Sequence, residues 1–193
     1  MSAICVYCAS SETIDPAYLE LAAEVGTRLA KEGYGLVSGG GRVSMMGAVA
    51  RAARAGGAHT VGVIPQHLVG YEMADGDADE LLVVDTMRER KLVMESRADG
   101  FLALPGGIGT LEELFEMWTS LSLTMHAMPV VVLDPDGFYE PLWAWLQDLV
   151  ARGFVRQAAL DVLVRARSVD EAFAALSAAI PPAPSPADTG LAP

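Results

Sequence analysis

The chain has 193 residues, of which 52% are hydrophobic and 20% charged, and this length suits one domain because most domains run to ~100–150 residues. Its formal net charge of −12 argues against a nucleic-acid-binding surface, which needs clustered lysine and arginine. No run approaches the roughly 18 apolar residues of a membrane-spanning helix, and the first residues lack the basic segment of a secretory signal, so we expect a cytoplasmic protein that does not bind membranes.

Apolar segments typical of strands alternate with amphipathic segments typical of helices. In chain order we predict strand 4–8, helix 15–33, strand 34–39, helix 46–55, strand 59–65, strand 80–85, helix 86–98, strand 100–105, helix 110–123, strand 128–134, helix 138–153, a short strand 159–164 and helix 168–180. In the first helix Asp15 suits the N-cap, Pro16 the first helical position and Gly33 a left-handed C-cap. The alternation predicts a doubly wound α/β domain, with helices on both faces of a mostly parallel sheet.

Two segments do not follow this alternation. Residues 65–79 have no clear periodicity and many acidic side chains, so we expect an exposed excursion over the sheet edge. Residues 181–193 are proline-rich with little apolar content, so we expect a disordered tail. The single predicted domain therefore covers residues 1–180.

Cys5 and Cys8 have the C-x-x-C spacing of redox pairs and zinc sites. They lie in a predicted strand, however, where residues three apart point to opposite faces of the sheet. The histidines, His59, His67 and His126, are scattered without the spacing of metal ligands. We therefore expect neither a metal nor a cofactor.

Three turns rich in glycine or serine follow predicted strands: CASS (8–11), SGGGRVSMMG (38–47) and PGGIGT (105–110). Ligands of open α/β sheets bind at the carboxyl ends of strands. There, glycines let backbone N–H groups approach an anion and helix N-termini add positive charge. The turns predict an anion site, but they complete neither the dinucleotide motif G-x-G-x-x-G, whose last place is Ser44 or Glu112, nor a P-loop, nor the esterase motif G-x-S-x-G. NAD and ATP are therefore not favoured.

The charged residues beside these turns allow two interpretations. Thr110 and Glu113 have the spacing of a capping box, and so do Thr86 and Glu89, which would explain all four by hydrogen bonding at helix starts. The basic pair in MRERK (87–91) is either solvated or bound to phosphate. Because the protein has little positive charge, a basic pair near glycine-rich turns favours phosphate.

PGGIGTLEE (105–113), MRERK (87–91) and SGGGRVSMMG (38–47) resemble motifs of the Lonely Guy family, the cytokinin riboside 5'-monophosphate phosphoribohydrolases. The resemblance runs from the first strand to roughly residue 165 and includes the spacing between the first two motifs. It implies a Rossmann-like fold, a homodimer and hydrolysis of the N-glycosidic bond of N6-modified adenosine 5'-monophosphates. The products would be a free cytokinin base and ribose 5-phosphate.

The resemblance also implies roles for single residues. Arg90 and Glu113 match the catalytic pair of the family. Since cleavage develops positive charge on the ribose and negative charge on the departing base, Glu113 would stabilise the sugar cation and activate water, and Arg90 would fix the substrate. The predicted substrate- and phosphate-binding residues are Ser10, Gly40, Glu72, Lys91, Gly107, Ile108, Gly109, Thr110 and Thr119.

The sequence also departs from the family, at Ser38, Ser44 and Met45 in the glycine-rich loop and at CASS in the first loop, which leaves the base preference open. Met45, Met46 and Met87 are candidates for the base pocket, although methionine is often a core residue. The helices over 110–123 and 138–150 carry enough apolar side chains for a subunit interface.

Two other functions stay open. Proteins with this glycine motif are often labelled lysine decarboxylases, an activity that would need pyridoxal phosphate on a lysine, for which Lys91 is the candidate. A nonenzymatic sensor of AMP-like nucleotides would use the same loops without the chemistry of Glu113.

Overall fold

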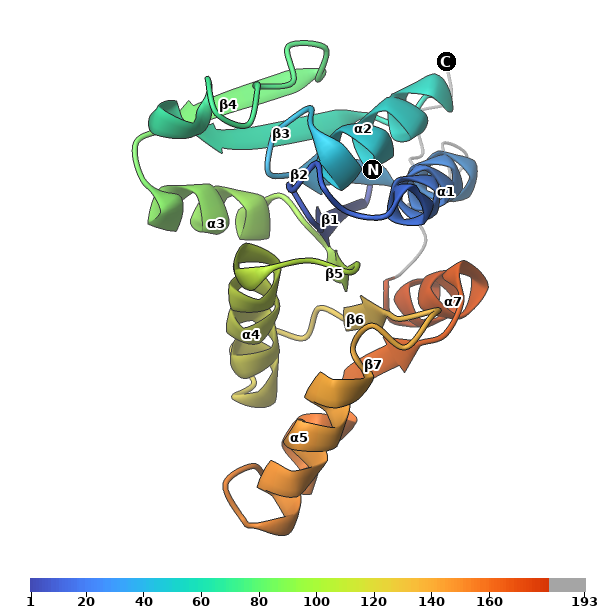
Figure 1. Cartoon of the computed structure of the whole chain (residues 1–193), viewed down its shortest axis with the longest axis vertical. Helices are drawn as coiled ribbons and strands as arrows, with labels where there is room; N and C mark the ends of the chain where they lie inside the picture. The colour runs from blue at the N-terminus through green and yellow to red at the C-terminus, as the bar shows by residue number, and fades with distance from the viewer. Residues whose placement is uncertain (181–193) are drawn as a thin grey trace, which may run out of the picture.

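Seven strands form one sheet that is parallel throughout, in the order β4-β3-β2-β1-β5-β6-β7 (Figure 1). The computed structural model describes residues 1–180, and the tail for which we expected disorder lies outside the described residues. The strands are β1 (Ala3–Tyr7), β2 (Gly35–Ser38), β3 (Thr60–Pro65), β4 (Glu80–Val84), β5 (Gly100–Ala103), β6 (Val130–Leu133) and β7 (Leu163–Ala166). The predicted α/β fold with a parallel sheet is confirmed.

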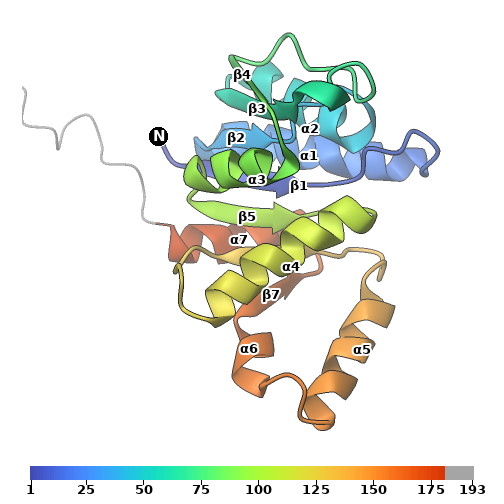
Figure 2. The same ribbon diagram turned by 90° about the vertical axis from the view of Figure 1, so that its left-hand side faces the viewer.

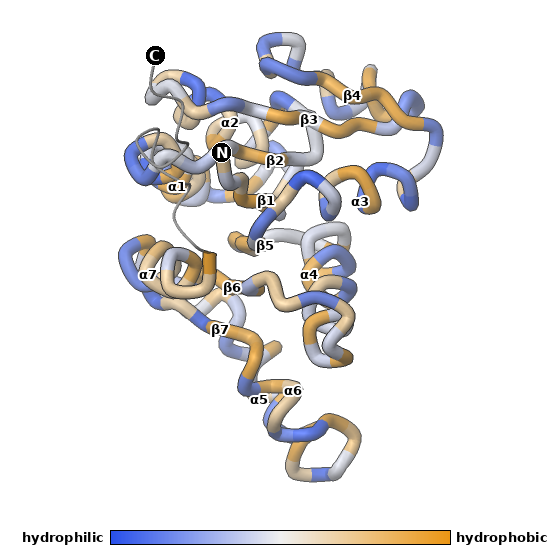
Figure 3. Tube along the Cα trace, turned by 180° about the vertical axis from the view of Figure 1, so that it is seen from behind, coloured by the Kyte–Doolittle hydropathy of each residue, from blue (hydrophilic) through white to orange (hydrophobic). Residues whose placement is uncertain are grey.

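The helices cover both faces of this sheet (Figures 1 and 2). They are α1 (Pro16–Glu32), α2 (Ser44–Ala55), the 3-10 helix η1 (Gln66–Leu68), α3 (Met87–Ser96), α4 (Ile108–Ser122), α5 (Glu140–Ala151), α6 (Gln157–Asp161) and α7 (Val169–Ala179). Helices α1, α2 and α7 bury one face, and α3, α4, α5 and α6 bury the other. The strands are the main hydrophobic segments of the trace, including the edge strands β4 and β7 (Figure 3).

Alternation along β1 separates the two cysteines, as predicted. Cys5 packs in the core under α4, whereas Cys8 packs in the core under α1 and α2. Both thiols are free and buried. The C-x-x-C spacing is thus a property of a buried strand.

Local signals set the ends of the first helix. The carboxylate of Asp15 accepts a hydrogen bond from the N–H of Ala17 at 2.9 Å, Pro16 opens α1, and Gly33 closes it with φ 78°. The predicted strand over 159–164 is wrong in its first half, where α6 forms and β7 begins only at Leu163. Leu160 and Leu163 are both buried and lie three residues apart, a spacing that suits a helical turn as well as a strand.

The prediction of an exposed excursion over residues 65–79 is confirmed for residues such as Tyr71 and Asp77, which are exposed, but it is wrong for Glu72 and Asp75, which are buried. This segment folds back on the glycine-rich loop, where Ala74 forms an antiparallel bridge with Gly41 and the N–H of Asp75 donates to the carbonyl of Gly40 at 2.8 Å. Asp75 is 4% exposed and pairs with Arg54 of α2 at 2.8 Å. Among the acidic residues that indicated exposure, Glu72 and Asp75 form ion pairs with arginines that are far away in the sequence. Local periodicity does not reveal such pairs.

The chain order of the strands places a crevice beside β1. From β1 the chain moves outward through β2, β3 and β4, and then returns to form β5 on the other side of β1. The connections after β1 and β5 therefore leave the sheet toward opposite faces, which opens the crevice in which such sheets bind ligands. Within residues 1–180 no helix has the length and apolar character needed to cross a membrane.

Candidate active site

A cavity of about 260 Å³ lies at the carboxyl ends of β1, β2 and β5. Its walls come from the loop after β1, the glycine-rich loop, the segment after η1, the first turns of α3 and the start of α4. The predicted site residues that line it are Ser10, Glu72, Arg90, Gly107, Ile108, Gly109, Thr110 and Glu113. Residues widely separated in the sequence thus meet where the strand order reverses.

The turn PGGIGT leaves the start of α4 open to a ligand. The helix begins at Ile108, and its N-cap, Gly107, has no side chain to cap it. The first internal hydrogen bond runs from the N–H of Leu111 to the carbonyl of Gly107 at 3.0 Å, so the N–H groups of the preceding three residues have no helical acceptor. These donors and the helix dipole provide a site for an anion such as phosphate.

Thr110 is the third residue of α4, so the capping box predicted for Thr110 and Glu113 is wrong. The one predicted for Thr86 and Glu89 is confirmed, because each side chain bonds the backbone of the other. The side chain of Thr110 packs over Gly106, where an added Cβ would lie 2.1 Å from its hydroxyl oxygen. A glycine is therefore required at 106.

Arg90, the fourth residue of α3, is 5% exposed and faces the cavity. Its Nε donates to the carbonyl of Val63 at 3.0 Å, and its Nη2 donates to the carbonyl of Gly39 at 2.6 Å and to Glu72 at 3.0 Å. Among residues 1–180, Nη1 has only a long contact of 3.8 Å to the sulfur of Met87. Arg90 is thus held by one side and can bind a ligand with the other.

Glycine at 39 makes this arrangement possible. An added Cβ there would lie 2.2 Å from Nη2 of Arg90. Glu72, 9% exposed, is the buried counter-ion of Arg90 and not a solvated loop acid. Removal of either partner would leave an uncompensated charge in the interior.

Glu113 lies one and a half turns into α4 and is partly exposed to the cavity. Within residues 1–180 its carboxylate is affected by burial and by nearby charges, and by no hydrogen bond. Burial raises its pKa to about 7; Arg90 opposes the rise, and Glu112 and Glu72 add to it. A carboxyl group that is half ionised near neutral pH is suited to proton transfer.

Lys91 does not line the cavity. Its Nζ lies 2.5 Å from Glu112 and 2.6 Å from Glu116, so it ties α3 to α4. Burial lowers the pKa of Lys91, but the hydrogen bonds that its ammonium group donates to Glu112 and Glu116 outweigh burial and raise it. Its predicted contact with phosphate stays a prediction.

Pyridoxal phosphate does not fit these residues. A Schiff base needs a lysine amine that is deprotonated and faces the cavity, and Lys91 meets neither requirement. The other lysine, Lys31, lies in the last turn of α1, outside the cavity lining. Within residues 1–180 no group of three or more His, Cys, Asp or Glu residues is arranged to hold a metal ion.

Two further predicted residues lie outside the cavity lining. Gly40, with φ 73°, packs against the backbone of β3 and anchors the segment after η1. Thr119 is exposed on α4 and lines a separate groove with Phe115, Trp118 and Trp145. Their roles in substrate binding stay predictions.

The apolar wall of the cavity contains Met46, Leu68, Met87 and Met94. Met46 and Met87 were predicted, whereas Met45 is fully buried and does not line the cavity. Leu68 and Met94 were missed. Met94 lies four residues after Arg90 in α3, and this helical spacing puts both on one face, so the position of Arg90 could have identified it.

Comparisons with known proteins agree with this geometry. A protein-family model described as "Possible lysine decarboxylase" matches residues 46–176. The "Cytokinin riboside 5'-monophosphate phosphoribohydrolase" of Mycobacterium tuberculosis is 54% identical over 172 residues, covering 89% of this chain and 91% of the relative. The "Cytokinin riboside 5'-monophosphate phosphoribohydrolase LOG" of Oryza sativa subsp. japonica is 40% identical, covering 92% of this chain and 74% of the relative. Among solved structures, the molybdenum cofactor binding protein of Rippkaea orientalis has a TM-score of 0.71 at 21% identity, covering 92% of this chain and 97% of that one, a likeness of fold alone.

Proposed function

Since this chain belongs to the Lonely Guy family of cytokinin riboside 5'-monophosphate phosphoribohydrolases, we propose that it hydrolyses the N-glycosidic bond of N6-modified adenosine 5'-monophosphates. Its substrates would include isopentenyladenosine and zeatin riboside monophosphates, and its products the free cytokinin base and ribose 5-phosphate. The observation that carries the proposal is one cavity that contains an uncapped helix start, an arginine whose Nη1 faces the cavity while its other nitrogens are hydrogen-bonded, and a carboxyl group with a raised pKa.

The start of α4 binds the 5'-phosphate. Ile108, Gly109 and Thr110 offer backbone N–H groups without helical acceptors, and the Thr110 hydroxyl adds a donor next to them. Such donors bind phosphate oxygens without any need for lysine. The phosphate in turn fixes the position of the ribose relative to the second turn of α4.

Glu113 acts on the ribose. As the C1'–N9 bond breaks, its electron pair leaves with the base and positive charge develops on the sugar, which the Glu113 carboxylate stabilises. Water then adds to C1' and gives a proton to the carboxylate. The departing base takes one proton from the solvent and Glu113 returns its proton to the solvent, so that in total one water supplies the hydroxyl on C1' and the proton on the base.

Arg90 supports the leaving side. Its Nη1 donates toward the departing base or the ribose hydroxyls, while Glu72 and the two backbone carbonyls fix the rest of the guanidinium. A fixed cation stabilises developing negative charge without reorganisation at the moment of reaction. Glu72 thereby acts through Arg90.

The proposal is tested by base release from AMP and from N6-isopentenyl-AMP, followed by chromatography. We expect release by the wild type, and a loss of about 10²-fold or more in Glu113→Gln with substrate binding retained. Glu116→Gln, an exposed glutamate on the same helix, is the control. A wild type that binds these nucleotides and releases no base would be a sensor, and the proposal would be wrong.

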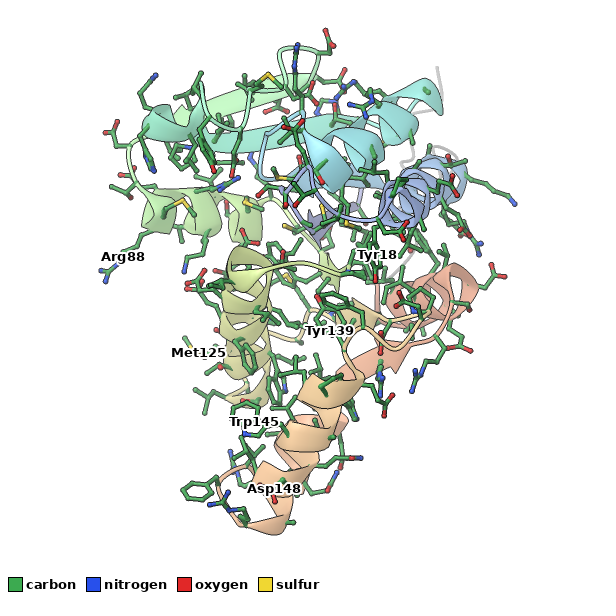
Figure 4. The ribbon with its side chains drawn as sticks, viewed as in Figure 1. Tyr18, Arg88, Met125, Tyr139, Trp145 and Asp148 are labelled. Atoms are coloured by element: carbon green, nitrogen blue, oxygen red, sulfur yellow. The ribbon has the colours of Figure 1, made fainter. Side chains whose placement is uncertain are left out.

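We also propose a cytoplasmic homodimer that uses the face formed by α4 and α5. Trp145 is 52% exposed on α5, and Met125, after α4, is exposed on the same side of the molecule (Figure 4). Trp145 and Phe154, which is 74% exposed, line the groove that contains Thr119 and make it largely apolar. Sedimentation tests the assembly, since a monomer at all concentrations would contradict it, and cell fractionation tests the location.

A further inference from the structure

The hydroxyl of Tyr139 lies behind the turn that leads into α4. Tyr139 precedes α5 and is 2% exposed, and Figure 4 labels it near the carboxyl end of β6. Its hydroxyl donates to the carbonyl of Leu104 at 2.6 Å. It does not line the cavity, and the mechanism above makes no use of it.

Leu104 is the last fixed point before the turn. Its N–H donates to the carbonyl of Tyr7 in β1 at 2.9 Å, and its carbonyl accepts from Tyr139. Tyr139 therefore holds the backbone carbonyl of the residue immediately before the PGGIGT turn, whose N–H groups would receive a phosphate.

The backbone of Tyr139 is itself fixed by a buried hydrogen-bond network. Its N–H donates to Asp134 at 3.0 Å, and Asp134, which has no exposed surface, accepts from Nε of Arg165 in β7 at 2.9 Å. The polar chain runs from the edge strand to the turn through residues that are buried or nearly so. A satisfied buried network of this kind fixes one geometry, because any departure leaves a polar group without a partner.

We propose that Tyr139 is a positioning residue that sets the orientation of the PGGIGT turn and so tunes phosphate affinity. The inference rests on the proposed function, since it assigns the phosphate to the start of α4. If Tyr139 only filled the core, loss of its hydroxyl would lower stability without a selective effect on phosphate.

The test compares wild type, Tyr139→Phe and Tyr18→Phe. Tyr18 is the control at a partly exposed position, because its hydroxyl also donates one hydrogen bond, at 2.7 Å, but to Asp136 in the loop before Tyr139 and not to the backbone before the turn. For Tyr139→Phe we expect about a fivefold rise in KM and in the inhibition constants of ribose 5-phosphate and inorganic phosphate, the factor that corresponds to one ordinary hydrogen bond. We expect kcat and inhibition by adenine to change by less than about twofold. Tyr18→Phe should match the wild type in all of these.

A second variant protects the test against poor folding. 4-Aminophenylalanine at position 139 keeps the ring and a donor, so it should restore phosphate affinity to within about twofold of the wild type. Equal effects on phosphate and adenine, or failure of this variant to restore phosphate affinity, would overturn the inference and leave the proposed function standing. A wild type that binds no ribose 5-phosphate and releases no base would overturn both.

Discussion

Replacement of Glu113 by glutamine should stabilise the protein while removing its activity. A carboxyl group whose pKa is raised on folding binds its proton more tightly in the native state than in the unfolded state. The native protein therefore loses stability relative to the unfolded chain as pH rises between the two pKa values. Glutamine does not titrate, so Glu113→Gln escapes this loss.

The size of the effect follows from the two pKa values. Burial raises the pKa of Glu113 from 4.5 to about 7, and each pH unit of difference corresponds to about 1.4 kcal/mol. The wild type should therefore lose about 3 kcal/mol of unfolding free energy between pH 4.5 and 7, relative to the variant. Below pH 4.5 the difference should not change with pH, and above pH 7 it should be constant.

Urea denaturation followed by circular dichroism at pH 5, 6, 7 and 8 measures this difference. We expect the unfolding free energy of Glu113→Gln, relative to that of the wild type, to increase steadily up to about pH 7. Glu116→Gln is the control, since it breaks an ion pair with Lys91 at the surface and should cost at most about 1 kcal/mol. A difference between Glu113→Gln and wild type that stays the same from pH 5 to pH 8 would refute the reasoning.

Three more predictions concern the reaction and the arginine. Because the carboxylate form of Glu113 reacts and burial raises its pKa to about 7, kcat/KM should rise with pH to a plateau with a midpoint near 7, and a flat profile between pH 5.5 and 8.5 would contradict this. Gly39→Ala puts a methyl group 2.2 Å from Nη2 of Arg90. We expect a thermal melt to show a loss of about 1–3 kcal/mol of unfolding free energy, and we expect kcat/KM to fall about tenfold or more. Unchanged kinetics would show that Arg90 can shift without cost. Glu72→Gln leaves the buried charge of Arg90 without its counter-ion and should lower the unfolding free energy in urea by about 3 kcal/mol. It should also lower the midpoint of the pH profile of kcat/KM, because Glu72 helps to raise the pKa of Glu113. No change in either measurement would argue against the pairing.

Much of the fold could be predicted because its signals are local. The caps of α1 and the alternation of apolar residues in β1 depend on neighbours in the sequence, and the structure confirms both. The segment 65–79 could not be predicted in the same way. Its place is decided by Arg54 and by the backbone of the glycine-rich loop, contacts that have no sequence periodicity.

The candidate site shows the same division. The glycines of the turn before α4 and the carboxylates in the first turns of α4 stand together in the sequence, so the motif indicated them directly. The ion pair of Arg90 with Glu72 joins α3 to the segment after η1 and became visible only in three dimensions. Lys91 next to Arg90 was expected to face the same way, but consecutive helical residues point in different directions, and Lys91 instead pairs with α4.

The contrast between the two walls of the cavity has a consequence for protein engineering. The wall of Arg90 is tied by hydrogen bonds to β3, the glycine-rich loop and the segment after η1, so a substitution there disturbs several elements at once. The apolar wall of Met46, Leu68, Met87 and Met94 adjoins Arg90 and is formed by apolar side chains, where exchanges between leucine and methionine usually cost less than about 1.5 kcal/mol. Libraries that aim at a new base preference should start with Met46 and Leu68, because Met87 contacts Nη1 of Arg90 and Met94 shares its helix.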